Sequence, residues 1–77
     1  MPRFYFDIDD GQGLVRDSEG SEHQDLEAAQ HEAVETLTQM GRELFPGTGD
    51  HELSIEIRGE EGIALMRTRL TLSARRL

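Results

Sequence analysis

Apolar and polar residues alternate near the start of the chain. Phe4, Phe6 and Ile8 occupy every second position of residues 3–8, and a period of two predicts a half-buried β-strand. Asp10-Gly11 predicts a tight turn, because glycine tolerates a positive φ. Residues 14–16 are then expected to return as a short partner strand. Residues 21–23 follow a second turn at 17–20 and form a weak, polar extension, for which the sequence leaves open whether it is a strand.

The middle of the chain has the longer repeat of an amphipathic helix. Apolar residues recur every three or four positions from Leu26 to Leu44, which places them on one helical stripe. Asp25 is well suited to cap the N-terminus, since its carboxylate accepts from an unpaired first-turn N–H. Phe45 precedes Pro46, and this position disfavours helical backbone angles. The helix is therefore expected to end there, and residues 47–50 to form a loop.

The C-terminal part alternates again, with apolar residues at odd positions from Leu53 to Ile57 and at even positions from Ala64 to Leu72. This pattern predicts a hairpin closed over residues 59–62. A one-residue shift in pairing would bury arginines, so the apolar residues of the two strands must lie on the same face. The predicted register places Ile57 opposite Ala64, Ile55 opposite Met66, Leu53 opposite Thr68, and, on the other face, Glu52 opposite Arg69 with Glu56 diagonal to Arg67.

These elements predict an α+β fold in the order ββαββ, with one helix packed on a small antiparallel four-stranded sheet. Residues 1–77 are expected to form a single domain. The predicted core consists of Phe4, Phe6, Ile8, Val15, Leu26, Ala29, Ala33, Leu37, Met40, Leu44, Leu53, Ile55, Ile57, Met66, Leu70 and Leu72.

Charge is distributed unevenly along the 77 residues, whose formal net charge is −8. Residues 1–38 contain ten acids and two arginines, whereas residues 39–77 contain six of each. An acidic chain disfavours general binding to DNA or to anionic membranes. The lack of cysteine excludes disulfides, thiolate metal sites and cysteine nucleophiles. The acidic N-terminal half and the arginine-rich C-terminus are complementary in charge, which permits self-association.

No apolar stretch resembles a signal peptide or a membrane-spanning segment. The chain is therefore expected to be a cytoplasmic protein with no membrane partner.

The chain resembles a family of short bacterial domains of unknown function that are frequent in soil and root-associated proteobacteria. The resemblance rests on the Met1–Ile8 opening, the turns at 10–11 and 17–20, the 25–29 helix start and the strands at 53–58 and 70–72. It implies a stand-alone, single-domain bacterial protein of this length. The family has no assigned catalytic or binding residues, so none are transferred. The polar Ser21 and His23 depart from the apolar residues expected there.

Two clusters were considered as metal sites. An EF-hand loop beginning at Asp7 would need a ligand, a glycine and a glutamate where Gly11, Gln12 and Ser18 stand. The cluster of Asp7, Asp9 and Asp10 is better explained as a solvated hairpin turn. The helical trio Glu27, His31 and Glu35 is more typical of an exposed, charge-paired face than of a metal site. We therefore expect no metal.

Catalysis has equally little support in the sequence. No serine stands in a Gly-x-Ser-x-Gly elbow or has a predicted His–acid partner. Gly11-Gln12-Gly13 lacks the third glycine and the strand-to-helix setting of a phosphate-binding loop. A core with one helix would also leave little room for a substrate pocket. We expect no enzyme activity, no cofactor and no small-molecule substrate.

The remaining hypothesis is a non-enzymatic interaction or regulatory module. It would act through the uncovered sheet face or a sheet edge, with a second copy of the chain or another protein as partner. The alternative is an RNA-contacting module that uses the C-terminal arginines, although Glu52 and Glu56 are placed to neutralise them. The candidate interaction surface consists of Tyr5, Glu52, Glu56, Leu65, Arg67, Arg69, Arg75 and Arg76.

Overall fold

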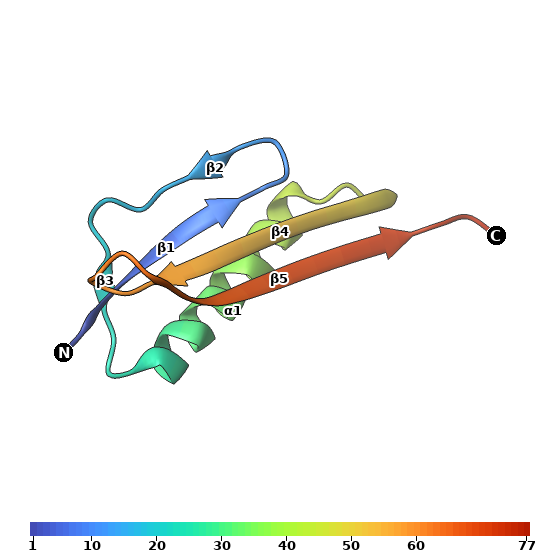
Figure 1. Cartoon of the computed structure of the whole chain (residues 1–77). Coiled ribbons are helices and arrows are strands. Elements are labelled where there is room, and N and C mark those ends of the chain that lie inside the picture. The colour runs from blue at the N-terminus through green and yellow to red at the C-terminus, as the bar shows by residue number, and fades with distance from the viewer.

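The computed structural model describes residues 1–77 and has an α+β fold, as predicted. Its elements, in chain order, are β1 (Arg3–Asp9), β2 (Leu14–Val15), β3 (Ser21–Glu22), α1 (Leu26–Leu44), β4 (Gly49–Arg58) and β5 (Ala64–Ala74) (Figure 1).

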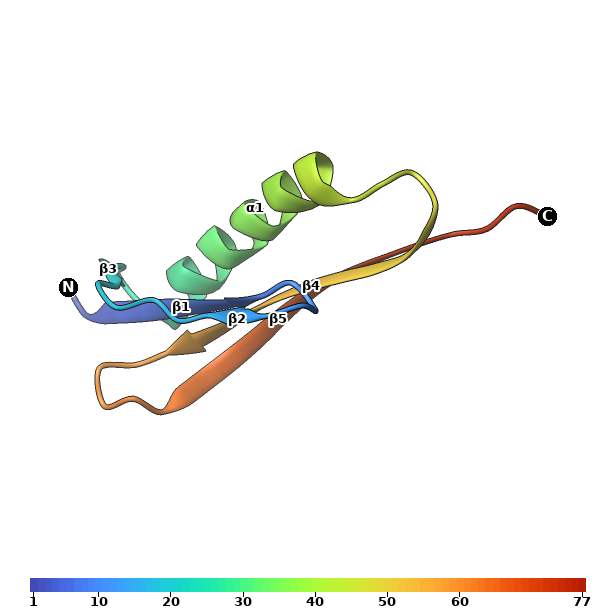
Figure 2. The ribbon, with the colours of Figure 1, turned by 90° about the horizontal axis from the view of Figure 1, so that it is seen from above.

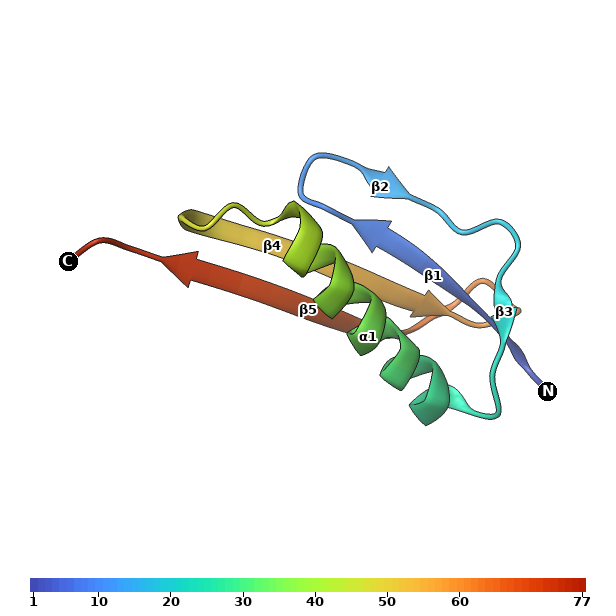
Figure 3. The same ribbon diagram turned by 180° about the vertical axis from the view of Figure 1, so that it is seen from behind.

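The sheet is antiparallel, with the strand order β2-β1-β4-β5 and with β3 paired to the start of β1. Figure 2 shows that α1 forms a second layer on one side of the sheet only. From that side the helix crosses the sheet diagonally, packing mainly on β4 and β5 (Figure 3). The open end of the β4–β5 hairpin, where β4 begins and β5 ends, extends past the last turn of the helix. The opposite face of the sheet, here called the open face, is uncovered.

The helix begins and ends where the sequence predicted. The carboxylate of Asp25 accepts a hydrogen bond of 2.9 Å from the backbone N–H of Ala28. At the other end Phe45 adopts an extended conformation, and its N–H donates to the carbonyl of Gly41. Both ends thus follow from local signals, a capping carboxylate and a residue that precedes proline.

The core lies between α1 and the central strands. Seven apolar residues are fully buried, namely Phe4, Ala29, Ala33, Leu37, Leu53, Ile55 and Ile57, and Phe6, Ile8, Leu26, Met40, Phe45, Met66 and Leu70 pack around them. The prediction was wrong for Val15, Leu44 and Leu72, which are exposed. Val15 lies on β2, at the edge of the sheet that the helix does not reach. Leu72 lies near the end of β5, in the part of the hairpin that extends past the helix. Phe45, which was not predicted, joins the core instead.

The helix lies close to β5 at Gly41, which is buried. A Cβ atom at this position would lie 2.7 Å from Cδ2 of Leu70. The glycine therefore lets the Leu70 side chain lie against the helix backbone.

The predicted hairpin has the right faces but the wrong register. Ile57 pairs with Met66 instead of Ala64, so β5 is shifted by two residues. The turn spans Gly59–Ile63, and a β-bulge follows at which Leu65 is the extra residue. A shift of two residues preserves which side chains share a face, so the alternation of the strands is as predicted.

The sheet also has one more strand than predicted, since Ser21 and Glu22 pair with Phe4 and Arg3. The polar composition misled the prediction because both residues are exposed. The following residue, His23, packs its ring against Phe6 at a centroid distance of 5.4 Å. The predicted loop is also shorter, because β4 already begins at Gly49.

Candidate functional site

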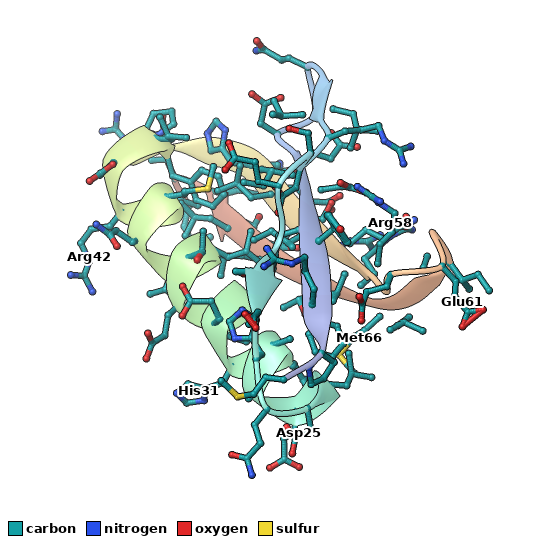
Figure 4. All side chains as sticks on the ribbon, turned by 90° about the vertical axis from the view of Figure 1, so that its left-hand side faces the viewer. Asp25, His31, Arg42, Arg58, Glu61 and Met66 are labelled. Carbon is teal, nitrogen blue, oxygen red and sulfur yellow. The ribbon has the colours of Figure 1, made fainter.

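The open face is built from alternate residues of three long strands, as Figure 1 views it. Figure 4 shows Arg58 on the side of the sheet opposite to α1, whereas Arg42 and His31 point away from the sheet on the helix. Along β4 the even-numbered residues share the face of Arg58, because successive strand side chains alternate. Their directly opposite partners on β1 and β5 lie on the same face. The open face carries Tyr5 and Asp7 of β1, Glu52, Ser54, Glu56 and Arg58 of β4, and Arg67 and Arg69 of β5.

Carboxylates of β4 pair with the predicted arginine stripe. The Glu56 carboxylate lies 2.6 Å from the Arg67 guanidinium, directly across the strands, and Glu52 lies 3.5 Å from Arg69 on a diagonal. The prediction had these two geometries interchanged, which follows from the two-residue shift of β5. Just beyond the strand, Arg75 lies 2.9 Å from Asp50. These pairs neutralise most of the stripe within the chain itself.

The remaining predicted surface residues lie apart from this ladder. The Tyr5 ring lies under the Arg58 guanidinium, 4.8 Å from its centre, so one face of the ring is covered. Leu65 is exposed at the bulge, next to Gly59. Arg76 is exposed beyond the end of β5 and forms no ion pair. The structure thus brings together Glu52, Glu56, Arg67 and Arg69. It places Tyr5 beside Arg58 and leaves Leu65, Arg75 and Arg76 at the two ends of β5.

The polar cluster around the one buried carboxylate, that of Asp7, was not predicted from the sequence. Asp7, Asp17 and Arg58, here called the edge clamp, converge beside β1. Arg58 donates from Nε to Oδ2 of Asp7 at 2.8 Å, and from Nη2 to Oδ1 of Asp7 at 3.2 Å and to the Asp17 carbonyl at 2.8 Å. Asp7 is only 3% exposed and lies 51 positions from its arginine. Such a bidentate pair is a strong, directional contact.

Asp17 completes the clamp by forming hydrogen bonds to β1 that a neighbouring strand would otherwise form. Its backbone N–H donates to Asp7, and its carboxylate accepts from the N–H of Phe6 at 3.1 Å. The same carboxylate accepts from the N–H groups of Glu19 and Gly20. β2 pairs with Ile8 and Asp9, and β3 pairs with Arg3 and Phe4. Asp17 therefore satisfies the β1 amide that lies between these two short strands.

The clamp shifts the pKa values of its members. The hydrogen bonds from Arg58 lower the pKa of Asp7, against the effect of burial. Burial alone would raise the pKa of Asp17, but the N–H donors of Gly20, Phe6 and Glu19 outweigh it, so that this pKa is also lowered. The bond to Asp7 correspondingly raises the pKa of Arg58. All three groups are therefore held in their charged forms.

One signal for the clamp was present in the sequence. Asp7 interrupts an aromatic strand at a position whose neighbours pack in the core, and such a carboxylate needs a partner if the sheet covers it. The local pattern did not show that β1 pairs with β4, which is what places Arg58 beside it.

A shallow groove of about 300 Å³ lies on the open face next to the clamp. It combines carboxylates and guanidinium groups, with Leu14 as its single apolar contributor. Such a mixed surface can exchange ion pairs with a partner. The one contact between a serine hydroxyl and a histidine is elsewhere, where Nε2 of His23 lies 2.9 Å from the Ser21 hydroxyl. No carboxylate is hydrogen-bonded to that histidine, so the pair lacks the third member of a triad.

The acidic residues considered as metal ligands point to different partners. Asp7 binds Arg58, whereas Asp9 accepts from the N–H of Gly11 and Asp10 from that of Gln12. On the helix, His31 lies 3.4 Å from Glu35, with both side chains exposed. No group of three or more histidine or acidic side chains is arranged to hold a metal ion. The helix does not combine the length and the apolar character needed to cross a membrane.

A comparison with known families identifies the chain. It belongs to a family described as a domain of unknown function, DUF6894, whose sequence model matches residues 3–71. The match covers the elements from β1 to β4 in full and β5 as far as Thr71. No curated protein and no solved structure matches the chain.

Proposed function

We propose that this domain is a non-enzymatic protein-interaction module that binds a partner strand along β5. The observation that carries the proposal is that one edge of the sheet is covered and the other is not. β5 is 11 residues long and is the terminal strand of the sheet, whereas the outer side of β1 is covered by β2, Asp17 and β3. An uncovered strand of this length presents unpaired N–H and C=O groups that an incoming strand can satisfy.

The side chains of β5 support the same proposal. Leu65 and Leu72 are exposed, at 47% and 37%, and could add apolar contacts to main-chain pairing. The Arg67 and Arg69 side chains are drawn toward the carboxylates of β4, which leaves the outer side of β5 less obstructed. The open-face groove extends the same surface with polar groups.

The alternative, an RNA contact through the arginines, has weaker support. Arg67, Arg69 and Arg75 each already have a carboxylate neighbour, and only Arg76 of the four is without one. An RNA backbone would have to compete with these carboxylates for the guanidinium groups.

The test is site-specific photo-cross-linking in the cells that produce the protein. A benzophenone amino acid placed at the exposed Thr71 of β5 is expected to form covalent adducts with a bound protein. The matched control carries it at Gln30, exposed on the outer side of α1. Adducts at position 71 but not at 30 would support the proposal, and equal adducts or none at both positions would contradict it. An adduct of twice the 8.7 kDa chain mass identifies a second copy, and any other mass identifies a different partner.

A further inference from the structure

We infer that the strand that binds β5 is β5 of a second copy, paired antiparallel about a two-fold axis at Leu70. This inference rests on the proposed function and names its partner. Closed two-fold dimers are the commonest oligomers, and a two-fold axis pairs a surface with itself. A single strand edge can therefore supply both halves of such an interface.

Geometry restricts the possible registers. A two-fold axis perpendicular to the sheet keeps every side chain on its own face, so the axis must pass between two identical residues. The pairing of opposite residues then depends only on which residue lies at the axis. Opposed like charges destabilise an antiparallel pair, so the arginines of β5 discriminate between these registers.

Only one register with a long overlap keeps the arginines apart. An axis at Arg67 or Arg69 opposes each of these residues with its own copy, and an axis at Thr68 opposes Arg67 with Arg69. An axis at Thr71 or Leu72 opposes Arg75, the residue after the strand, with Arg67 or Arg69. With Leu70 at the axis, Arg69 faces Thr71 and Arg67 faces Ser73, and the pairing extends from Met66 to Ala74. Axes nearer either end leave only short overlaps.

The surroundings of Leu70 fit a second copy. A groove of about 410 Å³ lies between α1 and β5, with Gly41, Phe45, Leu70 and Leu72 among its lining residues. In the Leu70 register the two copies of Leu70 meet beside these grooves, and each Leu72 faces Thr68 of the other chain. The pairing would also brace the part of the hairpin that extends past its own helix (Figure 3).

The arginines do not prevent this approach. Glu56 and Glu52 hold Arg67 and Arg69 over β4, on the side away from the neighbouring copy. Opposite the two arginines stand the uncharged side chains of Thr71 and Ser73, so no like charges are opposed. The Leu70 register is thus compatible with the charge pattern of both chains.

Disulfide trapping tests the register directly, because the chain contains no cysteine. Residues directly opposite on antiparallel strands have Cα atoms about 5 Å apart, within reach of a disulfide. Arg69→Cys mixed with Thr71→Cys is therefore expected to give a cross-linked dimer on mild oxidation. Either variant alone should not cross-link, since a two-residue offset separates identical positions by about 8 Å. Both positions are exposed on the open face, so folding should be unaffected.

A charge exchange at Thr71 provides a second readout. Thr71→Glu places one carboxylate opposite each Arg69 of the other copy, which gives two such pairs in the dimer. It should lower the dimer dissociation constant about 2- to 30-fold. Thr71→Arg should raise it by a similar factor. Within the monomer Thr71 faces Glu52, so the stability of the hairpin should change in the opposite sense. Thr48→Glu and Thr48→Arg, in the exposed loop before β4, are the matched controls and should change neither.

The outcomes separate the inference from the proposed function. Cross-linking in the mixture, with affinity changes of opposite sign at Thr71, supports the Leu70 register. Cross-linking of Arg69→Cys alone, or none in a mixture that sediments as a dimer, overturns the register. A chain that sediments as a monomer up to hundreds of micromolar overturns self-association. In that case photo-adducts of another mass at position 71 would still support the proposed function, and their absence would end both.

Discussion

The two edges of the sheet differ in whether the outward-facing backbone N–H and C=O groups have a partner. On the β1 side, two strands of two residues each leave a gap, and the Asp17 carboxylate binds the amide within that gap. At the opposite edge, the 11 residues of β5 pair with β4 on one side and have no neighbouring strand on the other. The first side is closed by buried charge and hydrogen bonds that stabilise the fold. The second is left available, and its exposed ion pairs contribute little to stability. The comparison separates residues that hold the domain together from residues that can bind a partner.

Acidification should open the closed side first and have the largest effect. The pKa values of Asp7 and Asp17 are lowered from 3.8 in the folded state. Their contribution is therefore complete above the unfolded-state pKa and is lost as the pH falls through the folded-state values. Hydrogen exchange should show the Phe6 and Gly20 amides losing protection before those of β4. A double Asp7→Asn, Asp17→Asn variant should show a flatter acid dependence of stability; an unchanged dependence would refute the role of the clamp.

Asp7→Asn should be the most destabilising single change. It leaves the Arg58 guanidinium without its buried carboxylate, and breaking such a pair lowers the free energy of unfolding by about 3 kcal/mol. Urea denaturation measures this loss. Asp9→Asn, two positions along the same strand but exposed, is the matched control and should change stability by less than about 0.5 kcal/mol. Equal effects of the two variants would contradict the comparison of the sides.

Asp17→Ala should have the next largest effect, about 2 kcal/mol, because hydrogen bonds to a charged acceptor are lost from three amides. The Phe6 amide would then lie at an open strand side, and its exchange should accelerate. Asp17→Asn retains one acceptor oxygen and should recover part of the loss. If Asp17→Ala is as stable as the natural sequence, Asp17 does not close the gap.

Glu56→Gln should have the smallest effect on folding. Its partner Arg67 is 59% exposed, so removal of the pair should change the free energy of unfolding by less than about 0.5 kcal/mol. The variant releases the Arg67 side chain from β4, so that it can obstruct the outer edge of β5. Dimer formation should therefore weaken although folding does not. Sedimentation at several concentrations, alongside urea denaturation, distinguishes the two effects. A large loss of stability would show that the β5 side also holds the fold together.

The helix ends and the faces of β4 and β5 could be predicted from the sequence, because they depend on residues that are close together in the chain. The Asp25 cap and the stop before Pro46 determine the helix ends locally. Alternation determines which side chains of β4 and β5 share a face. The interaction surface was predicted in part for the same reason, since Glu52, Glu56, Arg67 and Arg69 do gather on one face. The predictions that were wrong concern Val15, Leu44, Leu72, the third strand and the hairpin register. These depend on where the helix lies and on a bulge.

The sequence by itself thus determined the type of each long element, the ends of the helix and the two faces of the hairpin. Periodicity and capping act over a few residues, and they are readable wherever they occur. Only the tertiary structure decided that β1 pairs with β4, that Asp7 meets Arg58 across 51 positions, and that β5 is shifted by two residues. A shift by two leaves the apolar pattern of a strand unchanged, so hydrophobic burial cannot select among such registers. Long-range hydrogen bonds and the bulge make that selection in the folded chain.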